Sequence, residues 1–325
     1  MINLKKILCP VDLSEPSMLA LMLAQAVAGR YGAHLTIIHI LENPYLDIPG
    51  GGTGVFSFSE IMGLYCDERR EHIFDVLRRE GAPAVEVDTE FKEGVPCDEI
   101  TKLAREIKTD MIVMSTCTGG PHETLAGHTT ECVVRTSPCP VLSVRTDVSA
   151  NQREKLEHMH DLMEKEPGQK KTILLPTDFS EHSALATDYA ISFAQKYEAE
   201  IIVLHVMERV AEFTSMMGGD LPGYDTVLGY YGDLLETAKK LVEEICSRAK
   251  EHNVKADGRV ISGKPSYEIL DIAGSESIDM IVMGTHGRRG FSRVIHGSVA
   301  EAVVRHAPCS VLSVKRPEHD FITIE

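Results

Sequence analysis

No hydrophobic run in this 325-residue sequence is long enough to cross a membrane. The first residues, MINLKKILCPVDLS, also lack the uninterrupted apolar segment of a signal peptide. We therefore expect a cytoplasmic protein that does not act in a membrane.

Basic residues are scarce relative to acidic ones. The 33 lysines and arginines stand against 49 aspartates and glutamates, which gives a formal net charge of -16. Such a surface repels the phosphates of nucleic acids and of anionic lipids. We expect neither nucleic acid nor a membrane among the partners.

The eight cysteines form no C-x-x-C pair, and none has the spacing to histidine that a zinc site requires. Cys9 and Cys309 stand at the edges of expected strands, where any small apolar residue would serve. We therefore adopt reduced cytoplasmic thiols as the interpretation, over a metal site or disulfide bonds.

The sequence contains an internal duplication. KILCPVDLSEPS (6–17) matches TILLPTDFSEHS (172–183), and ECVVRTSPCPVLSV (131–144) matches EAVVRHAPCSVLSV (301–314). The offset of 166 to 170 residues is too long for a solenoid repeat. Each copy is therefore expected to be a whole domain.

These matches place two domains at residues 1–147 and 171–325, joined by a linker at 148–170. The linker is polar, but some of its apolar residues recur at helical spacing, which predicts that it is partly helical. Those residues are Leu156, Met159, Leu162 and Met163.

Within each copy, apolar runs of strand length alternate with longer stretches of helical periodicity. Runs such as IIVL (201–204) are apolar at consecutive positions, as in strands that are covered on both faces. The alternation predicts parallel sheets joined by right-handed crossovers. The fold class is therefore α/β, with two doubly wound, five-stranded, Rossmann-like domains in tandem. In the second copy the expected strands are 172–177, 199–206, 256–261, 279–284 and 310–315, and the expected helices are 180–197, 230–253, one from 265, and 298–306.

In such a fold, ligands bind beyond the carboxyl ends of the strands, where the strand order reverses. After the fourth strand of the second copy, Gly284 leaves room for the backbone to approach a ligand, and Gly287 and Gly290 permit the positive φ of a tight turn. Gly297 and Ser298 lead into the last helix, whose free N–H groups favour a phosphate. Three arginines of the same loop could offset phosphate charge: Arg288, Arg289 and Arg293.

Each feature also has a plain structural explanation. Ser298 and Glu301 form a capping-box pattern, and Asp178 could cap the first helix of the second copy. The arginines could form a solvated loop face, and His205, like His39 in the first copy, could be a hydrogen-bonded histidine at the end of the sheet. The joint placement of these residues after the first and fourth strands favours a ligand site, provided that those strands lie side by side.

The spacing Gly284-x-x-Gly287, nine residues, then Gly297-Ser298 resembles the nucleotide-binding signature of universal stress proteins. The segments PTDFS and APCSVLSV are similar to that family too, and the resemblance covers both copies. It implies that Asp178 lies near adenine and ribose, and that the backbone at Val206 meets the adenine edge. The candidate nucleotide-binding residues are Pro176, Thr177, Asp178, Val206, Met283, Gly284, His286, Gly287, Arg288, Gly297, Ser298, Val299 and Ala300.

The first copy departs from this signature. Ser115 and Thr118 replace the first two glycines, only eight residues separate Thr118 from Gly127, and His128 stands in the place of Ser298. Side chains at positions 115 and 118 would crowd phosphates. We therefore expect ATP in the second copy only, while Pro10 and Asp12 leave an adenosine-sized pocket open in the first.

Three functions agree with these residues. The first is a regulatory stress-response protein that binds ATP, ADP or AMP; the others are a slow ATPase or self-phosphorylating enzyme, and an assembly scaffold that binds no nucleotide. His286 could lie near the phosphates, but no P-loop motif is present and we assign no catalytic residue. A magnesium ion would rest on phosphate oxygens, with Asp178 the one carboxylate in reach.

The fifth strands, CPVLSVRT (139–146) and CSVLSVKR (309–316), are expected at sheet edges, which invite pairing with another strand. Single-domain proteins of the family resembled here dimerise through this edge. We expect the duplicated chain to make the same contact internally, and we leave open a further homodimer of chains. The segments 43–58 and 209–224 are either lids over the ligand or simply tolerated long loops.

Overall fold

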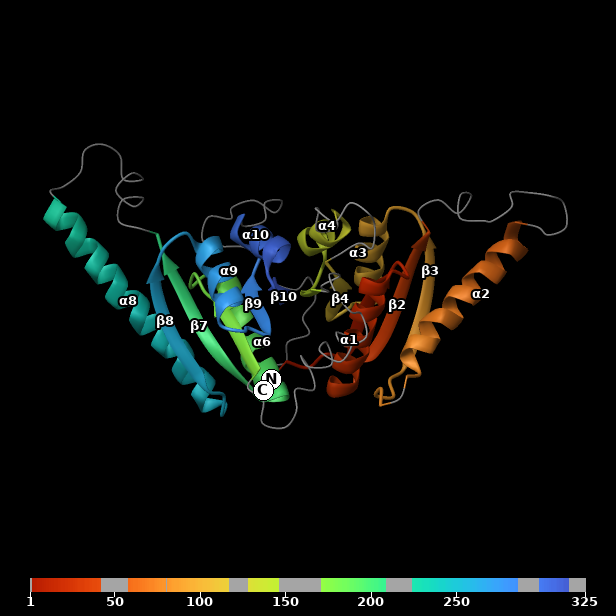
Figure 1. Ribbon diagram of the computed structural model, residues 1–325, viewed down its shortest axis with the longest axis horizontal. Coiled ribbons are helices and arrows are strands. Elements are labelled where there is room, and N and C mark those ends of the chain that lie inside the picture. The colour runs from red at the N-terminus through yellow and green to blue at the C-terminus, as the bar shows by residue number, and fades with distance from the viewer. Residues whose placement is uncertain are drawn as a thin grey trace. The chain divides into compact units, whose positions relative to one another are not determined.

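The computed structural model describes residues 2–41, 58–79, 81–116, 128–145, 171–208, 224–285 and 298–315. These residues form two compact units, which Figure 1 labels by their helices and strands. The expected linker 148–170 and nearly all of segments 43–58 and 209–224 lie outside the described residues. The domain limits drawn from the sequence therefore remain predictions.

The first unit contains five parallel strands in the order β3-β2-β1-β4-β5. Its elements are β1 (Lys6–Val11), α1 (Glu15–Tyr31), β2 (His34–Leu41), α2 (Phe58–Leu77), β3 (Val87–Glu93), α3 (Pro96–Glu106), β4 (Met111–Ser115), α4 (His128–Thr136) and β5 (Val141–Val144).

The second unit repeats this arrangement with the order β8-β7-β6-β9-β10, again parallel throughout. Its elements are β6 (Lys171–Pro176), α6 (Glu181–Tyr197), β7 (Ala199–Met207), α8 (Tyr224–Glu251), β8 (Ala256–Ser262), α9 (Pro265–Ser275), β9 (Met280–Gly284), α10 (Ser298–His306) and β10 (Ser310–Val314). The predicted fold class is confirmed, and helix α8 begins earlier than residue 230, where the sequence had placed its start.

The helices that follow the first strands have matching ends in the two units. The hydroxyl groups of Ser14 and Ser180 cap α1 and α6 by accepting the backbone N–H groups of Ser17 and Ser183. Gly32 ends α1 in the left-handed conformation with φ 65°. These caps fix where the chain leaves β1 and β6, at the carboxyl edge of each sheet.

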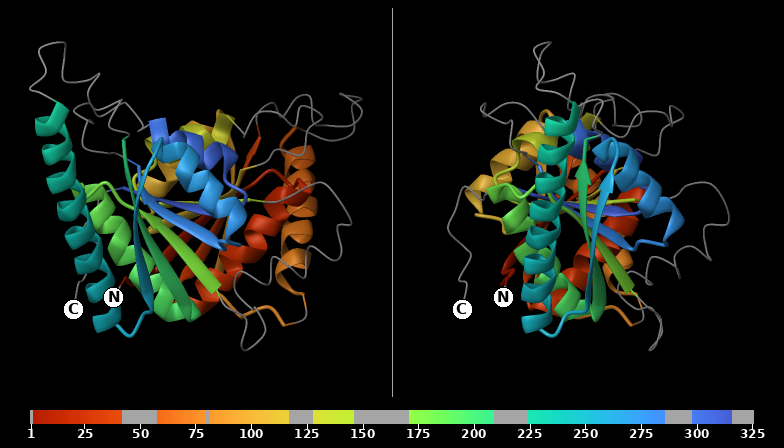
Figure 2. Two further views of the ribbon diagram at one scale, coloured as in Figure 1. Left: turned by 60° about the vertical axis from the view of Figure 1, so that its left-hand side comes forward. Right: turned by 90° about the vertical axis from the view of Figure 1, so that its left-hand side faces the viewer.

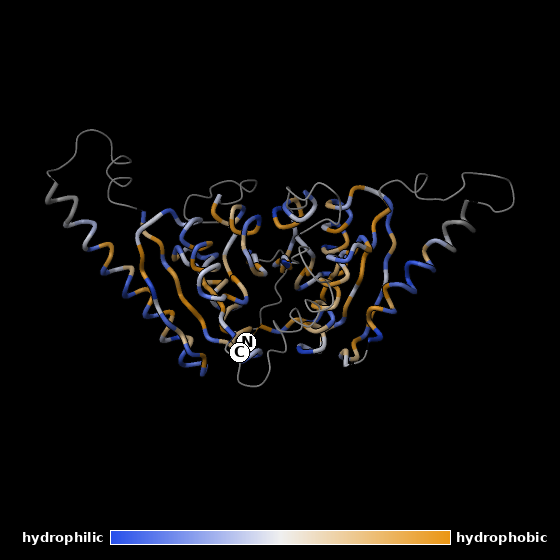
Figure 3. The backbone as a smooth tube through the Cα atoms, in the orientation of Figure 1, coloured by the Kyte–Doolittle hydropathy of each residue, from blue (hydrophilic) through white to orange (hydrophobic). Residues whose placement is uncertain are grey.

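Helices cover both faces of the strands in the second unit. On one face, Leu174, Ile202 and Ile281 of the strands form a core cluster with residues of α9 and α10. Ile272 of α9 and Val303 of α10 belong to this cluster. On the other face, α6 buries large rings, and α8 lies along β8 on the outside of the unit (Figures 1 and 2). Figure 3 shows the central strands as hydrophobic along most of their length. Double coverage explains why these strands are apolar at consecutive positions.

The amino-terminal end of the first strand is held by an aspartate in each unit. The carboxylate of Asp110 accepts the backbone N–H groups of Lys5 at 2.6 Å and Lys6 at 2.8 Å. Asp279 accepts the N–H group of Thr172 at 2.7 Å in the same way. These carboxylates precede β4 and β9, so they lie at the edge of the sheet opposite the expected ligand site. Their role is to hold the start of the first strand in the sheet.

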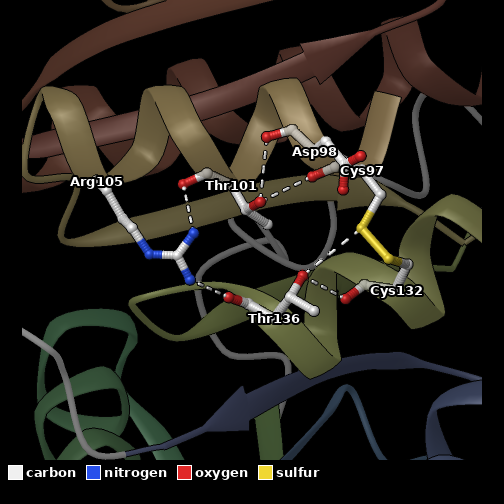
Figure 4. Close-up of a disulfide and its surroundings, with 6 residues drawn as sticks. All are labelled: Cys97, Asp98, Thr101, Arg105, Cys132 and Thr136. Carbon is white, nitrogen blue, oxygen red and sulfur yellow. Dashed lines mark hydrogen bonds between the residues drawn. A yellow bond between two sulfur atoms is a disulfide. The ribbon is translucent and has the colours of Figure 1, made fainter. Parts of the chain in front are cut away.

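A disulfide bond joins Cys97 of α3 to Cys132 of α4, with their Cα atoms 6.0 Å apart (Figure 4). The expectation that all cysteines are reduced is therefore wrong for this pair. The two residues are 35 positions apart in the sequence, and the packing of α3 on α4 brings them together. The cysteines described as free are Cys9, Cys66, Cys139, Cys246 and Cys309.

Candidate functional site

The carboxyl ends of β6 and β9 lie side by side in the second unit. Strand β6 pairs with β7 through six residues, and on its other side Ile173 and Leu174 align with Met280 and Ile281 of β9. The chain leaves β6 toward α6 on one face and passes from β9 to α10 on the other. This confirms that strands one and four are neighbours and creates the reversal of strand order at which α/β sheets bind ligands.

The turn after β6 is organised by its own side chains. The hydroxyl of Thr177 donates to Oγ of Ser183 at 3.2 Å and accepts the N–H group of Phe179 at 3.1 Å. Oδ1 of Asp178 accepts the N–H group of Ser180 at 3.0 Å. The residue that caps α6 is thus Ser180 and not Asp178. Asp178 is partly exposed, whereas Pro176 and Thr177 are buried.

Gly284 is required by a contact within the protein. A Cβ atom at this position would lie 3.0 Å from the carbonyl carbon of His182 and 3.1 Å from the N atom of Ser183, in the first turn of α6. The sequence had suggested that this glycine makes room for a ligand. The structure shows a close approach of helix α6 to the end of β9, and the backbone atoms concerned cannot rotate away.

A pair of rings lies between the ends of β6 and β7. Nδ1 of His205 is 2.7 Å from the carbonyl oxygen of Thr177, and the imidazole lies 4.4 Å from the ring of Phe179, measured between centroids. Because a carbonyl can only accept, Nδ1 carries the proton. His205 is thus the hydrogen-bonded histidine that the sequence allowed for. Phe179 adopts φ 61°, and its place beside His205 had no signal in the sequence.

Val206 and Met283 lie in the hydrophobic core of the second unit. The side chain of Met283 is 5% exposed, and Val206 packs against the same core cluster. Any contact of Met283 with a ligand therefore has to come from its backbone. The same holds for Ala300, whose methyl group is buried in that cluster.

Helix α10 presents its first turn at the same edge of the sheet. Ser298 is its first residue and is exposed, Val299 is partly buried, and the N–H groups of the first four residues have no partner within the helix. Glu301 pairs with Arg305 at 3.3 Å. The start of α10 is therefore a set of backbone donors at a helix terminus, the kind of group that binds phosphate.

The remaining candidates lie outside the described residues. They belong to segment 286–297 and comprise His286, Gly287, Arg288 and Gly297, together with Gly290, Arg289 and Arg293. Their part in the site rests on the sequence signature alone.

The first unit differs at the corresponding edge. His39 is buried, with Nδ1 2.8 Å from the carbonyl oxygen of Val11, and its ring lies edge-on to Phe91 at 5.8 Å. The guanidinium of Arg70 stands 5.3 Å from the centre of the Phe91 ring. The register of β7 and β8 places Val260 beside His205, so the second unit has a smaller residue where the first has Phe91.

Within the described part of the chain, no group of three or more histidine, cysteine, aspartate or glutamate side chains is arranged to hold a metal ion. No helix in that part is both long enough and apolar enough to span a membrane.

Comparison with known proteins gives matches to one family. The sequence model of the Universal stress protein family matches residues 3–145 and again residues 170–315. A universal stress protein of Methanocaldococcus jannaschii is 34% identical over 150 residues, which are 46% of this chain and 85% of that protein. One from Mycolicibacterium smegmatis is 24% identical over 313 residues, which are 95% of this chain and 96% of that protein.

Among solved structures, a universal stress protein from Archaeoglobus fulgidus matches with a TM-score of 0.63 at 21% sequence identity. The match covers 96% of this chain and 98% of that one. At 21% identity, this structural similarity supports the fold alone.

Proposed function

Because the chain belongs to the universal stress protein family, we propose that it is a regulatory protein that binds an adenine nucleotide, and that its second unit holds the nucleotide. ATP is the first expected ligand, and ADP and AMP are the smaller ligands of the same site. The protein would act by reporting nucleotide occupancy to partners through its surface.

The observation that carries this proposal is the position of β6 between β7 and β9. It gathers the turn 177–180 and the end of β9 at one edge of the sheet. The signature in the sequence, Gly284-x-x-Gly287 followed by Gly297-Ser298, starts at the last residue of β9 and ends at the first residue of α10. A ligand with an adenosine end and a phosphate end suits an edge with a partly exposed carboxylate on one side and a helix amino terminus on the other.

Within this site, Asp178 is proposed to face the ribose and adenine, and the backbone of Val206 to face the adenine edge. The N–H groups of Ser298, Val299 and Ala300 would bind phosphate oxygens, supported by the positive end of the α10 dipole. Magnesium, where present, would be carried mainly by the phosphates and water. The protein's contribution is then orientation and charge compensation, with no catalytic group required.

The first unit is proposed to bind no triphosphate. Ser115 brings a side chain to the end of β4 where the second unit has Gly284, and the exposed His128 begins α4 where Ser298 begins α10. Segment 117–127 also contains no lysine or arginine to balance phosphate charge. The two units would therefore differ in ligand although they share a fold.

Calorimetric titration of the full chain with ATP tests the proposal, and two matched substitutions locate the site. Ser298→Glu places a carboxylate at the start of α10, where it repels phosphate, and His128→Glu makes the same change at the start of α4. We expect one ATP per chain, abolished by Ser298→Glu and unchanged by His128→Glu. Gly287→Val should abolish binding too, and excess chelator should weaken it.

Two equivalent ATP sites, or loss of binding in His128→Glu alone, would contradict the assignment to the second unit. Absence of any adenine nucleotide binding would leave the scaffold function. Phosphate release that accompanies binding and is lost in His286→Ala would instead favour the enzyme.

A further inference from the structure

The disulfide bond between Cys97 and Cys132 links the start of helix α3 to the middle of helix α4 in the first unit. Cys97 is the second residue of α3, and Cys132 lies in the middle of α4 (Figure 4). We propose that these two cysteines are a redox-active site that exchanges with low-molecular-weight thiols and disulfides, and that the exchange controls how firmly the first turns of α4 are held. The proposal is independent of nucleotide binding by the second unit.

The fold does not need this bridge. At the corresponding positions the second unit has Ser266 and Ala302, and there apolar residues of α9 and α10 belong to one core cluster without a disulfide bond. The first unit has the same apolar contact, in which Ile100 and Leu103 of α3 meet Val133 and Val134 of α4. Opening the disulfide therefore leaves the helices packed, which is the condition for a bridge that can open and close reversibly.

The two ends of α4 are held differently. Near its carboxyl end, Arg105 of α3 donates to the carbonyl oxygen of Thr136 at 2.8 Å (Figure 4). Nearer its amino end, the hydroxyl of Thr130 donates to the carbonyl oxygen of Ser115 at 2.8 Å, and the bridge at Cys132 comes next. Loss of the bridge thus loosens the start of α4 while Arg105 keeps its end in place.

The start of α4 matters because it continues directly from segment 117–127, which follows β4. In the second unit the equivalent helix start is the proposed phosphate site. A change in the mobility of α4 would therefore change the mobility of the carboxyl edge of the sheet in the first unit. Thr130 of α4 donates a hydrogen bond to Ser115 of β4 at that edge.

The two cysteines differ in exposure as whole residues. Cys97 is 6% exposed, whereas Cys132 is only partly buried. An incoming thiolate therefore reaches the sulfur of Cys132, and the sulfur of Cys97 becomes the leaving group. This order of events places the departing negative charge at the amino terminus of α3.

That location favours a departing thiolate. Helix α3 has no side-chain cap at Val95, so the positive end of its dipole can stabilise a negative charge on Cys97. The N–H groups of Asp98 and Glu99 already donate to the carbonyl oxygen of Val95, so the N–H group of Cys97 itself is the backbone donor that remains in this turn. Oγ1 of Thr136 lies 3.6 Å from Sγ of Cys97 and at present donates to the carbonyl oxygen of Cys132 at 2.8 Å. Rotation of this one hydroxyl would supply a hydrogen bond to the thiolate. The carboxylates of Asp98 and Glu99 oppose the charge, but Asp98 is exposed to water and Glu99 lies 3.7 Å from Lys102.

The exchange balances in two steps. A small-molecule thiolate attacks the sulfur of Cys132, the bond between the protein sulfurs breaks, and Cys97 leaves as a thiolate that takes a proton from water. A second thiolate attacks the small-molecule sulfur of the mixed disulfide, which releases a small disulfide and the thiolate of Cys132. Two small thiols are oxidised and the protein disulfide is reduced by two electrons; an excess of small disulfide drives the reverse reaction.

The test uses the full chain equilibrated in mixtures of reduced and oxidised glutathione. Trapping the thiols by alkylation gives the oxidised fraction, and hydrogen exchange monitors α4, with α10 as the internal control. We expect the oxidised fraction to follow the glutathione ratio as a two-electron couple, and exchange in residues 128–132 to rise about tenfold or more on reduction. Exchange in α10 should not change.

Cys132→Ser should show the fast exchange at every glutathione ratio, whereas Cys66→Ser should behave as the parent. Thr136→Val should slow the opening of the bridge, and Thr136→Ser should restore its rate. Equal exchange of α4 in both redox states, or a bridge that never opens across the glutathione series, would overturn the proposal and leave a static cross-link.

Discussion

The ring of Phe179 lies 4.4 Å from the imidazole of His205, and the two ring planes are inclined by 32°. The pair joins the turn after β6 to the end of β7, where Nδ1 of His205 donates to the carbonyl oxygen of Thr177. Two neighbouring strands are thereby connected at the edge where the ligand site is proposed. In the first unit the residue that corresponds to Phe179 is Leu13, which has a similar backbone with φ 66°.

Phe179→Leu should therefore fold, because a leucine already occupies the equivalent backbone conformation. Loss of the ring contact should lower the free energy of unfolding by about 1 kcal/mol and shift the NMR resonances of the His205 ring. Leu13→Ala serves as a control, since it should leave those resonances in place. Unchanged His205 resonances in Phe179→Leu would show that the ring contact does not order the histidine.

Gly284→Ala should destabilise the protein by about 1–3 kcal/mol in urea unfolding, with or without nucleotide. The added methyl group would lie 3.0 Å from backbone of α6, which would have to move. The matched change in the first unit is Ser115→Ala, at a position that already bears a side chain, and it should have a much smaller effect. Full stability of Gly284→Ala would contradict the helix contact as the reason for this glycine.

Asp110→Ala should cost about 1–3 kcal/mol, because the N–H groups of Lys5 and Lys6, which form partly buried hydrogen bonds, lose their acceptor. Asp110→Asn keeps an oxygen and should cost less. Burial raises the pKa of the Asp110 carboxyl above its ordinary value of 3.8, an effect that the N–H groups of Lys5 and Lys6 partly offset. The folded protein then binds this proton more tightly than the unfolded chain does.

The contribution of Asp110 to the free energy of unfolding should therefore fall as the pH rises from about 3.8 through the raised pKa. Denaturation curves of Asp110→Asn and of the parent over that range measure the effect. A parent that gains stability relative to Asp110→Asn as the pH rises there would give the opposite sign and contradict the assignment.

The free thiols should differ sharply in reactivity toward a maleimide at neutral pH. Burial raises the pKa of Cys246 to about 11 and that of Cys309 to about 12, and it raises the pKa of Cys9 further. Cys66 is partly exposed, and burial raises its pKa less. In a Cys117→Ser background, which removes the cysteine outside the described residues, Cys66 should be labelled first. Native-state labelling of Cys309 at a similar rate would contradict its burial.

The expected pairing of the fifth strands can be tested without substitution. Val311 belongs to the core cluster of its own unit, so an added charge there would unfold the unit and report nothing about pairing. Amide hydrogen exchange is the better measurement. If β5 and β10 pair, the N–H groups that point away from β4 and β9 should be as protected as those in the ladders. Protection confined to the ladder side would contradict the arrangement.

Much of the fold could be predicted because it is local. Consecutive apolar residues mark β7 and β9, the helical period marks α6, and the repeat of both patterns marks the duplication. The predicted helix at 298–306 coincides with α10, since Gly297 precedes it and His306 ends it. The start of α8 was missed although Tyr224, Val227, Leu228 and Tyr231 recur at helical spacing, because Gly229 and Gly232 lower the helical propensity of that stretch.

The rest depends on contacts between distant residues, which the sequence does not record. The role of Gly284 toward a ligand stays a prediction, and its close approach to α6, about a hundred residues earlier along the chain, had no signal in the sequence. Cys97 and Cys132 have no motif spacing, and only the packing of two helices makes them neighbours. The ring of Phe179 beside His205 likewise depends on the pairing of β6 with β7.

The carboxylates that hold the first strands have a consequence for synthesis on the ribosome. Lys6 and Asp110 are 104 residues apart, and the equivalent pair in the second unit, Thr172 and Asp279, is separated by 107. The central strand of each unit therefore stays without one neighbour and its aspartate until most of that unit has been translated. The duplication confines this delay to one unit at a time, because the first can complete its sheet while the second is still being made. A pause in translation placed far enough beyond residue 145 for the whole first unit to have left the ribosome should thus yield a folded, protease-resistant nascent unit, and a pause before residue 110 should not.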